Sequence, residues 1–169
     1  MTARDIQRCL IRERYRRSFV IPNYTPRGWF ECDIFECTKA GFFREFEIKL
    51  TRSDFKADAK KSRRHYDAQW QATHNKKHDL LYQRDVRGPK QFYYVTPVGL
   101  LAHEEIPDWA GLIELHDADG RLYEQQPVMA PILHRQRADP KLKAHAESIC
   151  YWRFHNVFLN GKIKIDGDP

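Results

Sequence analysis

One stretch decides the fold expected of this chain: ECDIFECTKAGFFREFEIKL, residues 31–50. Two runs rich in aromatic and apolar residues flank the loop Lys39-Ala40-Gly41, which has the length and composition of a hairpin connection. Gly41 can take the positive φ that a three-residue hairpin loop needs. The stretch therefore predicts an antiparallel hairpin closed by Thr38 and Phe42.

The two faces of this predicted hairpin differ in chemistry. Pairing outward from the loop places Asp33 opposite Glu47. It also places Glu31 opposite Lys49. Because side chains alternate between faces, the charged residues share one face: Glu31, Asp33, Glu45, Glu47 and Lys49. The other face, which we expect to be the core face, carries Phe30, Ile34, Phe46, Ile48 and Leu50.

Four carboxylates on one face repel one another and are costly to bury without a compensating cation. Magnesium or manganese prefers oxygen ligands, which Asp33, Glu47 and the backbone carbonyl of Ile48 could supply. Lys49 returns to the same face, where its ammonium can orient the attacking water or offset charge on a scissile phosphate. Such a set is typical of metal-assisted phosphodiester hydrolysis, in which the metal polarises the phosphate and lowers the pKa of bound water.

The same residues allow a simpler interpretation, in which the hairpin face is solvated and carries cross-strand ion pairs such as Glu31 with Lys49. A carboxylate followed two residues later by lysine recurs by chance in many proteins. The spacing alone leaves both interpretations open.

Length and composition bound the class of protein. The chain has 169 residues, of which 41% are hydrophobic and 13% aromatic, so we expect one folded domain with a real core. The net charge of +6 favours an acidic partner such as nucleic acid, although many basic surfaces are simply solvated. No apolar run approaches the ~20 residues of a membrane span, so no membrane partner is expected.

The cysteines indicate a reducing compartment. Cys9, Cys32, Cys37 and Cys150 are scattered, no CxxC pair occurs, and no signal segment is expected at the start of the chain. We therefore expect free thiols and a cytoplasmic location. A zinc site built from Cys32, Cys37 and some of the eight histidines is an alternative with atypical spacing.

Residues 3–17 have helical periodicity, with Ile6, Cys9 and Leu10 on one apolar stripe. Glu13 falls on that stripe in line with Ile6, where a carboxylate is awkward unless it faces a polar site. It is therefore a candidate accessory carboxylate. Pairing of Glu13 with Arg17 at the next turn is the alternative.

A second helix is expected over residues 51–70, with Thr51 or Ser53 near its N-cap. Its outward flank gathers four basic residues that could hold a DNA backbone: Lys56, Lys60, Arg63 and Arg64. An ordinary solvated helix face is the alternative.

The rest of the chain alternates connectors and strands. Residues 73–90 read as a polar connector with one helical turn near 78–82, and residues 91–97 and 111–115 read as strands. Gly120 marks a turn into residues 121–127. A last helix starts at Asp139-Pro140, and its apolar stripe is expected to dock on the body: Ala146, Ile149, Cys150, Phe154 and Val157.

The order of these features resembles the PD-(D/E)XK nuclease superfamily: a helix with Glu13, a strand with Asp33, a strand with Glu47-Ile48-Lys49, then a helix and a strand. The segments FEIKLTRSDFKADAKK, GPKQFYYVTPVGLL and EEIPDWAGLIEL further resemble the MmcB-like DNA-repair proteins and related phage nucleases, over about residues 29–115. The chain departs from the name motif in having Cys32, not proline, before Asp33.

This resemblance implies an α/β (α+β) fold, the restriction-endonuclease-like αβββαβ core, with a mixed sheet flanked by helices. We expect this core at residues 1–120 and a C-terminal extension at 121–169, made of a strand or loop and an amphipathic helix that packs on the core. By position, the resemblance makes Asp33 and Glu47 metal ligands, Lys49 the catalytic lysine and Glu13 an accessory carboxylate.

The expected function is Mg²⁺- or Mn²⁺-dependent hydrolysis of DNA in repair, recombination or phage DNA metabolism, within a bacterial cell or phage-infected host. A homodimer or a recruiting protein partner is possible, and cleavage of RNA stays open. Two alternatives also stay open. One is a DNA- or protein-binding module of the same fold that does not cut, and the other is a zinc-stabilised interaction protein.

Overall fold

The hairpin forms where the sequence predicts it. The computed structural model describes residues 1–66 and 72–160, and in it β2 (Cys32–Thr38) pairs antiparallel with β3 (Phe43–Ile48). Ile34 pairs with Phe46 and Cys37 with Phe43, which is the predicted register. Gly41 has a φ of 80°, and the Thr38 amide donates to the Phe42 carbonyl at 2.9 Å.

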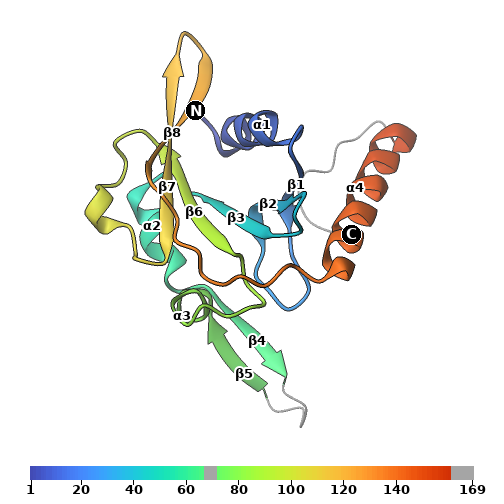
Figure 1. The fold of residues 1–169 in the computed structure, drawn as a ribbon. Coiled ribbons are helices and arrows are strands. Elements are labelled where there is room, and N and C mark those ends of the chain that lie inside the picture. Colours follow the sequence, from blue (N-terminus) through green and yellow to red (C-terminus); the bar gives the residue numbers. More distant parts are fainter. Residues whose placement is uncertain (67–71, 161–169) are drawn as a thin grey trace.

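This hairpin is part of a six-stranded mixed sheet in the order β1-β2-β3-β6-β7-β8 (Figure 1). The other members are β1 (Ser18–Tyr24), β6 (Gln91–Pro97), β7 (Ala110–Ala118) and β8 (Arg121–Val128). β3, β6 and β7 run parallel, and the remaining neighbours are antiparallel. β8 thus completes the sheet, although the predicted boundary at residue 120 places it in the extension.

Helix α1 (Ala3–Arg14) lies over one face of the sheet (Figure 1). Thr2 and Asp5 form a capping box at its start. Its buried stripe packs on the face that the sequence predicts to be apolar, and the joint cluster contains Ile6, Cys9, Leu10, Ile34, Phe46, Ile48, Tyr93, Val95, Ile113 and Leu115. Each fully buried aliphatic side chain there contributes about 1.5–3 kcal/mol to stability.

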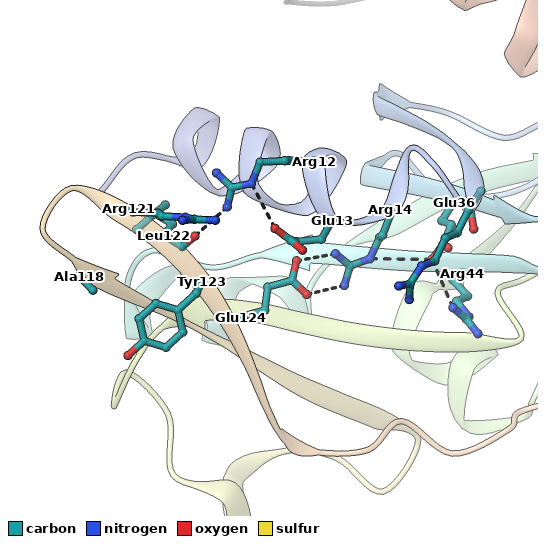
Figure 2. Close-up of a pocket in the computed structure, with 12 residues that line it drawn as sticks. Arg12, Glu13, Arg14, Glu36, Arg44, Ala118, Arg121, Leu122, Tyr123 and Glu124 are labelled. Atoms are coloured by element: carbon teal, nitrogen blue, oxygen red, sulfur yellow. Dashed lines mark hydrogen bonds and ion pairs between the residues drawn. The ribbon is translucent and has the colours of Figure 1, made fainter.

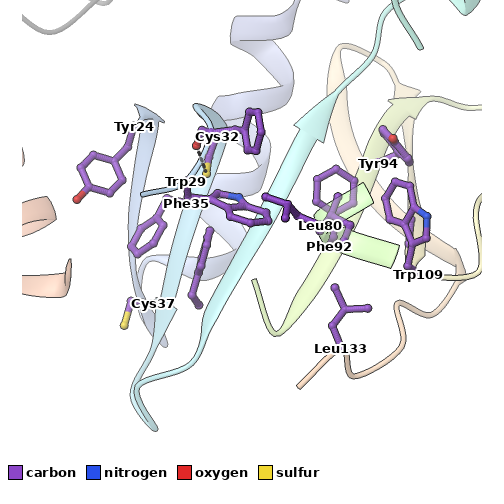
Figure 3. Close-up of a cluster of buried hydrophobic side chains, with 14 of the residues drawn as sticks. Tyr24, Trp29, Cys32, Phe35, Cys37, Leu80, Phe92, Tyr94, Trp109 and Leu133 are labelled. Carbon is purple, nitrogen blue, oxygen red and sulfur yellow. Dashed lines mark hydrogen bonds between the residues drawn. The ribbon is translucent and has the colours of Figure 1, made fainter. Parts of the chain in front are cut away.

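The opposite face carries a second and larger core, which the sequence did not predict. Figure 3 shows the rings of Trp29, Phe35, Phe92 and Trp109 gathered there. Helix α3 (Lys77–Tyr82) adds buried leucines to this core, and α4 (Pro140–Asn160) adds Ala146. The acidic face of the hairpin is therefore inside the protein, and its charged groups must be compensated locally.

The expected helix over residues 51–70 is wrong beyond its first turns. Thr51 caps α2 (Arg52–Asp58), but the chain then enters β4 (Ser62–Tyr66), which pairs with β5 (Ala72–Lys76). The predicted residues 67–70 lie outside the described ranges. Helix-forming composition is overridden here because the buried Asp58 bonds to other elements and the following segment pairs in a hairpin. This hairpin projects from the body (Figure 1).

The residues of β1 did not lead us to predict a strand there, although the αβββαβ core implied by the resemblance contains three strands after its first helix. It contains Pro22, which a strand at the edge of a sheet tolerates because one of its sides has no partner. With β1 in place, the order α1, β1, β2, β3, α2, β6 agrees with the expected αβββαβ core, and the β4–β5 hairpin and α3 are inserted before β6.

The last helix begins at Pro140 as predicted and lies beside β1 (Figure 1). Ala146 is buried, and Arg153 donates to the carbonyls of Pro22 and Asn23. Phe154, which the predicted stripe turns inward, is exposed instead. None of the helices in the described ranges is both long enough and apolar enough to cross a membrane.

Candidate active site

A pocket of about 540 Å³ brings together the residues predicted from the acidic hairpin. It lies where α1 begins and β3 ends. Asp33, Glu47, Ile48 and Lys49 line it, with further residues from α1, β1, α2 and their flanks: Ala3, Arg4, Gln7, Asn23, Leu50, Asp54 and Lys61. We call it the carboxylate pocket.

Asp33 lies just beyond the regular ladder between β2 and β3. The last paired residues are Ile34 and Phe46, and the Asp33 side chain instead accepts a hydrogen bond from the Ile48 amide at 2.7 Å. Gln7 donates to the Asp33 backbone carbonyl at 3.2 Å. Burial, followed by the charge of Glu47, raises the pKa of Asp33 to about 7. A cation at this position would reverse that destabilisation of the carboxylate.

Glu47 is surrounded by three lysines. Lys49 donates to Oε1 at 3.0 Å, Lys77 donates to Oε2 at 2.7 Å, and Lys61 also contacts Oε1. Burial alone would raise the pKa of Glu47, but these ammonium groups hold it below its usual range. The side chains of Lys49 and Lys77 are 3% and 0% exposed, whereas that of Lys61 is 41% exposed.

Asp58, at the end of α2, connects the elements behind the pocket. It bonds to Lys49 at 2.8 Å, to the His78 ring at 2.9 Å and to the Tyr94 hydroxyl at 3.0 Å. Lys61 lies 3.2 Å away. Burial raises its pKa, but the His78 bond and the lysines together lower it. Asp58 thereby fixes the position of the Lys49 ammonium.

The simpler interpretation, a solvated hairpin face, is wrong for Glu45. Its side chain is fully buried, pairs with Lys77 at 2.5 Å and accepts from the Trp29 indole at 2.7 Å. Lys77 thus joins Glu45 to Glu47, and these carboxylates hold its pKa well above the usual value although burial lowers it. Glu31 is exposed as expected, but the proposed Glu31–Lys49 pair does not form, because Lys49 pairs with Glu47 and Asp58.

Glu13 does not face the carboxylate pocket. It is 50% exposed and pairs with Arg12 at 3.1 Å, so neither the inward position nor the pair with Arg17 is found. Arg14, four residues after Leu10, takes the inward position on the next helical turn. Helix α1 ends at Arg14. Glu13 lines a different pocket.

The four predicted DNA-binding residues do not share one helix face. Lys56 is exposed on α2 and Lys60 in the turn after it, while Arg63 and Arg64 lie on β4. The Arg63 guanidinium donates to the backbone carbonyl of Trp29, so its contact is structural. Arg64 is exposed.

Sequence reasoning missed Asp58, Lys61, Lys77 and His78. For Lys77 a signal existed, because it stands three and four residues before Leu80 and Leu81 and therefore on the inward stripe of α3. Asp58 likewise follows Phe55 by three residues on α2. In both cases the sequence signal was a charged residue on the same stripe of a short helix as its apolar residues.

The donor set of the pocket fits a hard cation. Two carboxylates and the Ile48 carbonyl are oxygen ligands of the kind that magnesium and manganese take, with water completing the coordination. Within residues 1–66 and 72–160, no three His, Cys, Asp or Glu side chains are grouped so as to hold a metal ion. All four cysteines are free thiols.

Comparisons with known proteins show the fold alone. No protein-family model matches the chain, and no curated protein is significantly similar to it. Among solved structures it is similar to SPO1766, a protein of unknown function from Silicibacter pomeroyi. The TM-score is 0.57 and the identity 18%, over 98% of this chain and 92% of that one. The match supports the α/β fold of this chain, with its six-stranded sheet, and says nothing of its activity.

Proposed function

We propose that the chain is a metal-dependent nuclease that hydrolyses DNA phosphodiester bonds in repair, recombination or phage DNA metabolism, inside a bacterial cell or phage-infected host. One observation carries the proposal: Asp33, Glu47 and Lys49 converge in one open pocket at the end of β3. The resemblance to the PD-(D/E)XK superfamily assigns these same positions to metal binding and catalysis.

Asp33, Glu47 and the Ile48 carbonyl would hold Mg²⁺ or Mn²⁺. When bound, the ion would polarise the phosphate and lower the pKa of a coordinated water. The protein supplies the rest. Lys49 is held by Glu47 and Asp58 at 3.0 and 2.8 Å, so its ammonium is fixed at the pocket wall, where it would offset charge on the scissile phosphate.

Charge balance sets a condition on the binding of a cation. Three carboxylates and three lysines form one connected cluster: Glu45, Glu47, Asp58, Lys49, Lys61 and Lys77. We call this the lysine–carboxylate cluster. Since it is balanced, a divalent ion requires Asp33 to be ionised and one lysine to leave. Lys61 is the lysine that can turn into solvent without leaving a buried ammonium behind.

The test is cleavage of single-stranded, duplex and branched DNA, and of RNA, with Mg²⁺ or Mn²⁺. Wild type should cut, and Asp33→Ala and Lys49→Ala should each lose about 10²–10⁴-fold in rate. Glu31→Ala, an exposed carboxylate of the same hairpin, should cut like wild type. Inactive wild type on every substrate would contradict the enzymatic proposal, and active Asp33→Ala and Lys49→Ala variants would contradict the site.

A second candidate is a binding module of the same fold that grips nucleic acid or protein without cutting. The contact of both Glu47 oxygens with lysines favours it, because a metal ligand is already compensated there. Calorimetric titration with Mn²⁺ separates the two: binding that Asp33→Ala abolishes supports the nuclease, and absence of binding supports the module.

A further inference from the structure

A second pocket, of about 780 Å³, lies at the C-terminal end of α1 (Figure 2), whereas the carboxylate pocket lies at its N-terminal end. Five arginines from α1, the turn after it, β3 and β8 line it: Arg12, Arg14, Arg17, Arg44 and Arg121. Only three carboxylates oppose them, those of Glu13, Glu36 and Glu124. We call it the arginine pocket, and its wall has a positive excess.

Part of this charge is fixed within the wall. Arg14 makes a two-pronged pair with Glu124, at 2.5 and 2.8 Å. Arg12 is held by Glu13 at 3.1 Å and by the Leu122 carbonyl at 2.8 Å (Figure 2). These contacts join α1 to β8 and give the pocket a defined shape.

Glu36 forms the floor of the pocket. Its side chain is 3% exposed, and its Oε2 accepts no hydrogen bond although Arg44 and Arg14 lie 3.6 and 4.0 Å away. Arg44 is therefore only loosely paired with Glu36, whereas Arg14 is held by Glu124.

Two arginines at the rim have no acidic partner within the described part of the chain. Arg17 follows α1 and Arg121 begins β8, and both are exposed. Guanidinium groups bind phosphate oxygens in a planar, two-pronged geometry that ammonium groups cannot provide. An anion with several charged oxygens is the ligand that this rim fits.

We propose that the arginine pocket binds a backbone phosphate of nucleic acid, away from the bond that is cut. This inference rests on the proposed nuclease function. From Arg4 at the carboxylate pocket to Arg14 at the arginine pocket, α1 spans about 15 Å. Measured along the axis of a duplex, that length corresponds to about four phosphates of one strand. Binding there would fix the distance between a held phosphate and the scissile one.

The choice of nucleic acid over an acidic peptide follows from the proposed function, and competition by polyglutamate tests it. Tyr123 lines the same pocket and is half exposed, but its ring lies on the other side of β8 from Arg14 and Glu124 (Figure 2). That ring stacks on His116 at 5.0 Å. The arginines alone therefore carry the recognition of the phosphate.

The test is fluorescence anisotropy with labelled single-stranded and duplex oligonucleotides in EDTA, at several salt concentrations. Arg17→Ala/Arg121→Ala should bind about tenfold more weakly and lower the slope of log affinity against log salt by about 1–2. The matched control is Arg135→Ala/Lys141→Ala, which removes the same charge from two exposed residues elsewhere. That control should change binding by less than about twofold.

A second variant works in the opposite direction. Glu36→Gln removes the buried negative charge from the floor and should tighten binding, whereas Glu31→Gln, an exposed carboxylate outside the pocket, should not. Equal losses in the two double variants, no loss in either, or equal competition by polyglutamate would overturn the phosphate site. Because binding is measured without metal, a wild type that binds but never cuts contradicts the proposed function and leaves this site standing.

Discussion

The carboxylate pocket and the arginine pocket are built on the same hairpin, yet they treat charge in opposite ways. Each contains a buried glutamate of that hairpin, Glu47 in one and Glu36 in the other. Glu47 is compensated by lysines that are themselves mostly buried. Glu36 lies 3.6 Å from the partly exposed Arg44 and 4.0 Å from Arg14, which is held by Glu124 instead.

The difference separates charge that holds the fold from charge that is available to a ligand. In the lysine–carboxylate cluster every ion except Lys61 is buried, so removal of one buried partner leaves an uncompensated buried charge. In the arginine pocket, Arg12, Glu13 and Arg44 keep much of their water, and pairs of such exposed groups contribute little to stability. Equivalent substitutions in the two regions should therefore have very different effects on stability.

The largest effect is expected at Lys77. Lys77→Met leaves Glu45 and Glu47 buried without the ammonium that joins them, which should lower the free energy of unfolding by about 3–5 kcal/mol. Urea denaturation measures it. Lys76→Met, an exposed neighbour, is the control and should change stability by less than about 0.5 kcal/mol. Similar values for both variants would mean that the cluster is not structural.

A smaller and pH-dependent effect is expected at Asp33. Its pKa of about 7 in the folded protein lies above the ordinary 3.8, so the native state keeps a proton that the unfolded chain releases between these values. The stability that this group contributes is fully present below about pH 4 and is lost as the pH rises through about 7.

Asp33→Asn should therefore stabilise the metal-free protein by about 1–3 kcal/mol at about pH 8, and the gain should vanish near pH 4. Urea denaturation across this range measures it, with Glu31→Gln as the exposed control. A gain that does not depend on pH would disprove the assignment of the raised pKa to Asp33.

Lys61 should affect the affinity for a cation. If its ammonium competes with a metal for Glu47, Lys61→Met should tighten Mn²⁺ binding about tenfold, or ~1.4 kcal/mol. Isothermal titration calorimetry measures this, and Lys60→Met, the exposed preceding lysine, is the control. Weaker binding by Lys61→Met would show that the two cations do not compete.

The smallest effect on stability is expected at Arg44. Its side chain is 39% exposed and lies 3.6 Å from Glu36, so Arg44→Gln should cost less than about 1 kcal/mol. A loss as large as that of Lys77→Met in the same urea experiment would erase the distinction between the two regions.

What could be predicted from the sequence was local. The loop Lys39-Ala40-Gly41 and the alternation of side chains gave the correct register, because both depend on neighbouring residues. They also brought Asp33, Glu47 and Lys49 into one pocket. The fold class is confirmed at the level of the mixed sheet and its helices.

What could not be predicted depends on contacts between distant segments. Lys77 meets Glu45 and Glu47 only after the chain has crossed back to the sheet, and Asp58 meets His78 and Tyr94 in the same way. These contacts also explain why the expected helix over residues 51–70 stops at Asp58. The helical pattern reflects the local composition of this segment, and tertiary contacts overrode that local preference.

The crossover that brings Lys77 to the sheet also has a consequence for the order of events in folding. The β2–β3 hairpin closes over a short loop, whereas β3 pairs with β6, Arg44 with Gln91, only when a long intervening segment has closed. The hairpin can thus form while its carboxylates are still hydrated, and Lys77 is buried later. We expect the loss of Lys77 to appear mainly as faster unfolding, with little change in the folding rate.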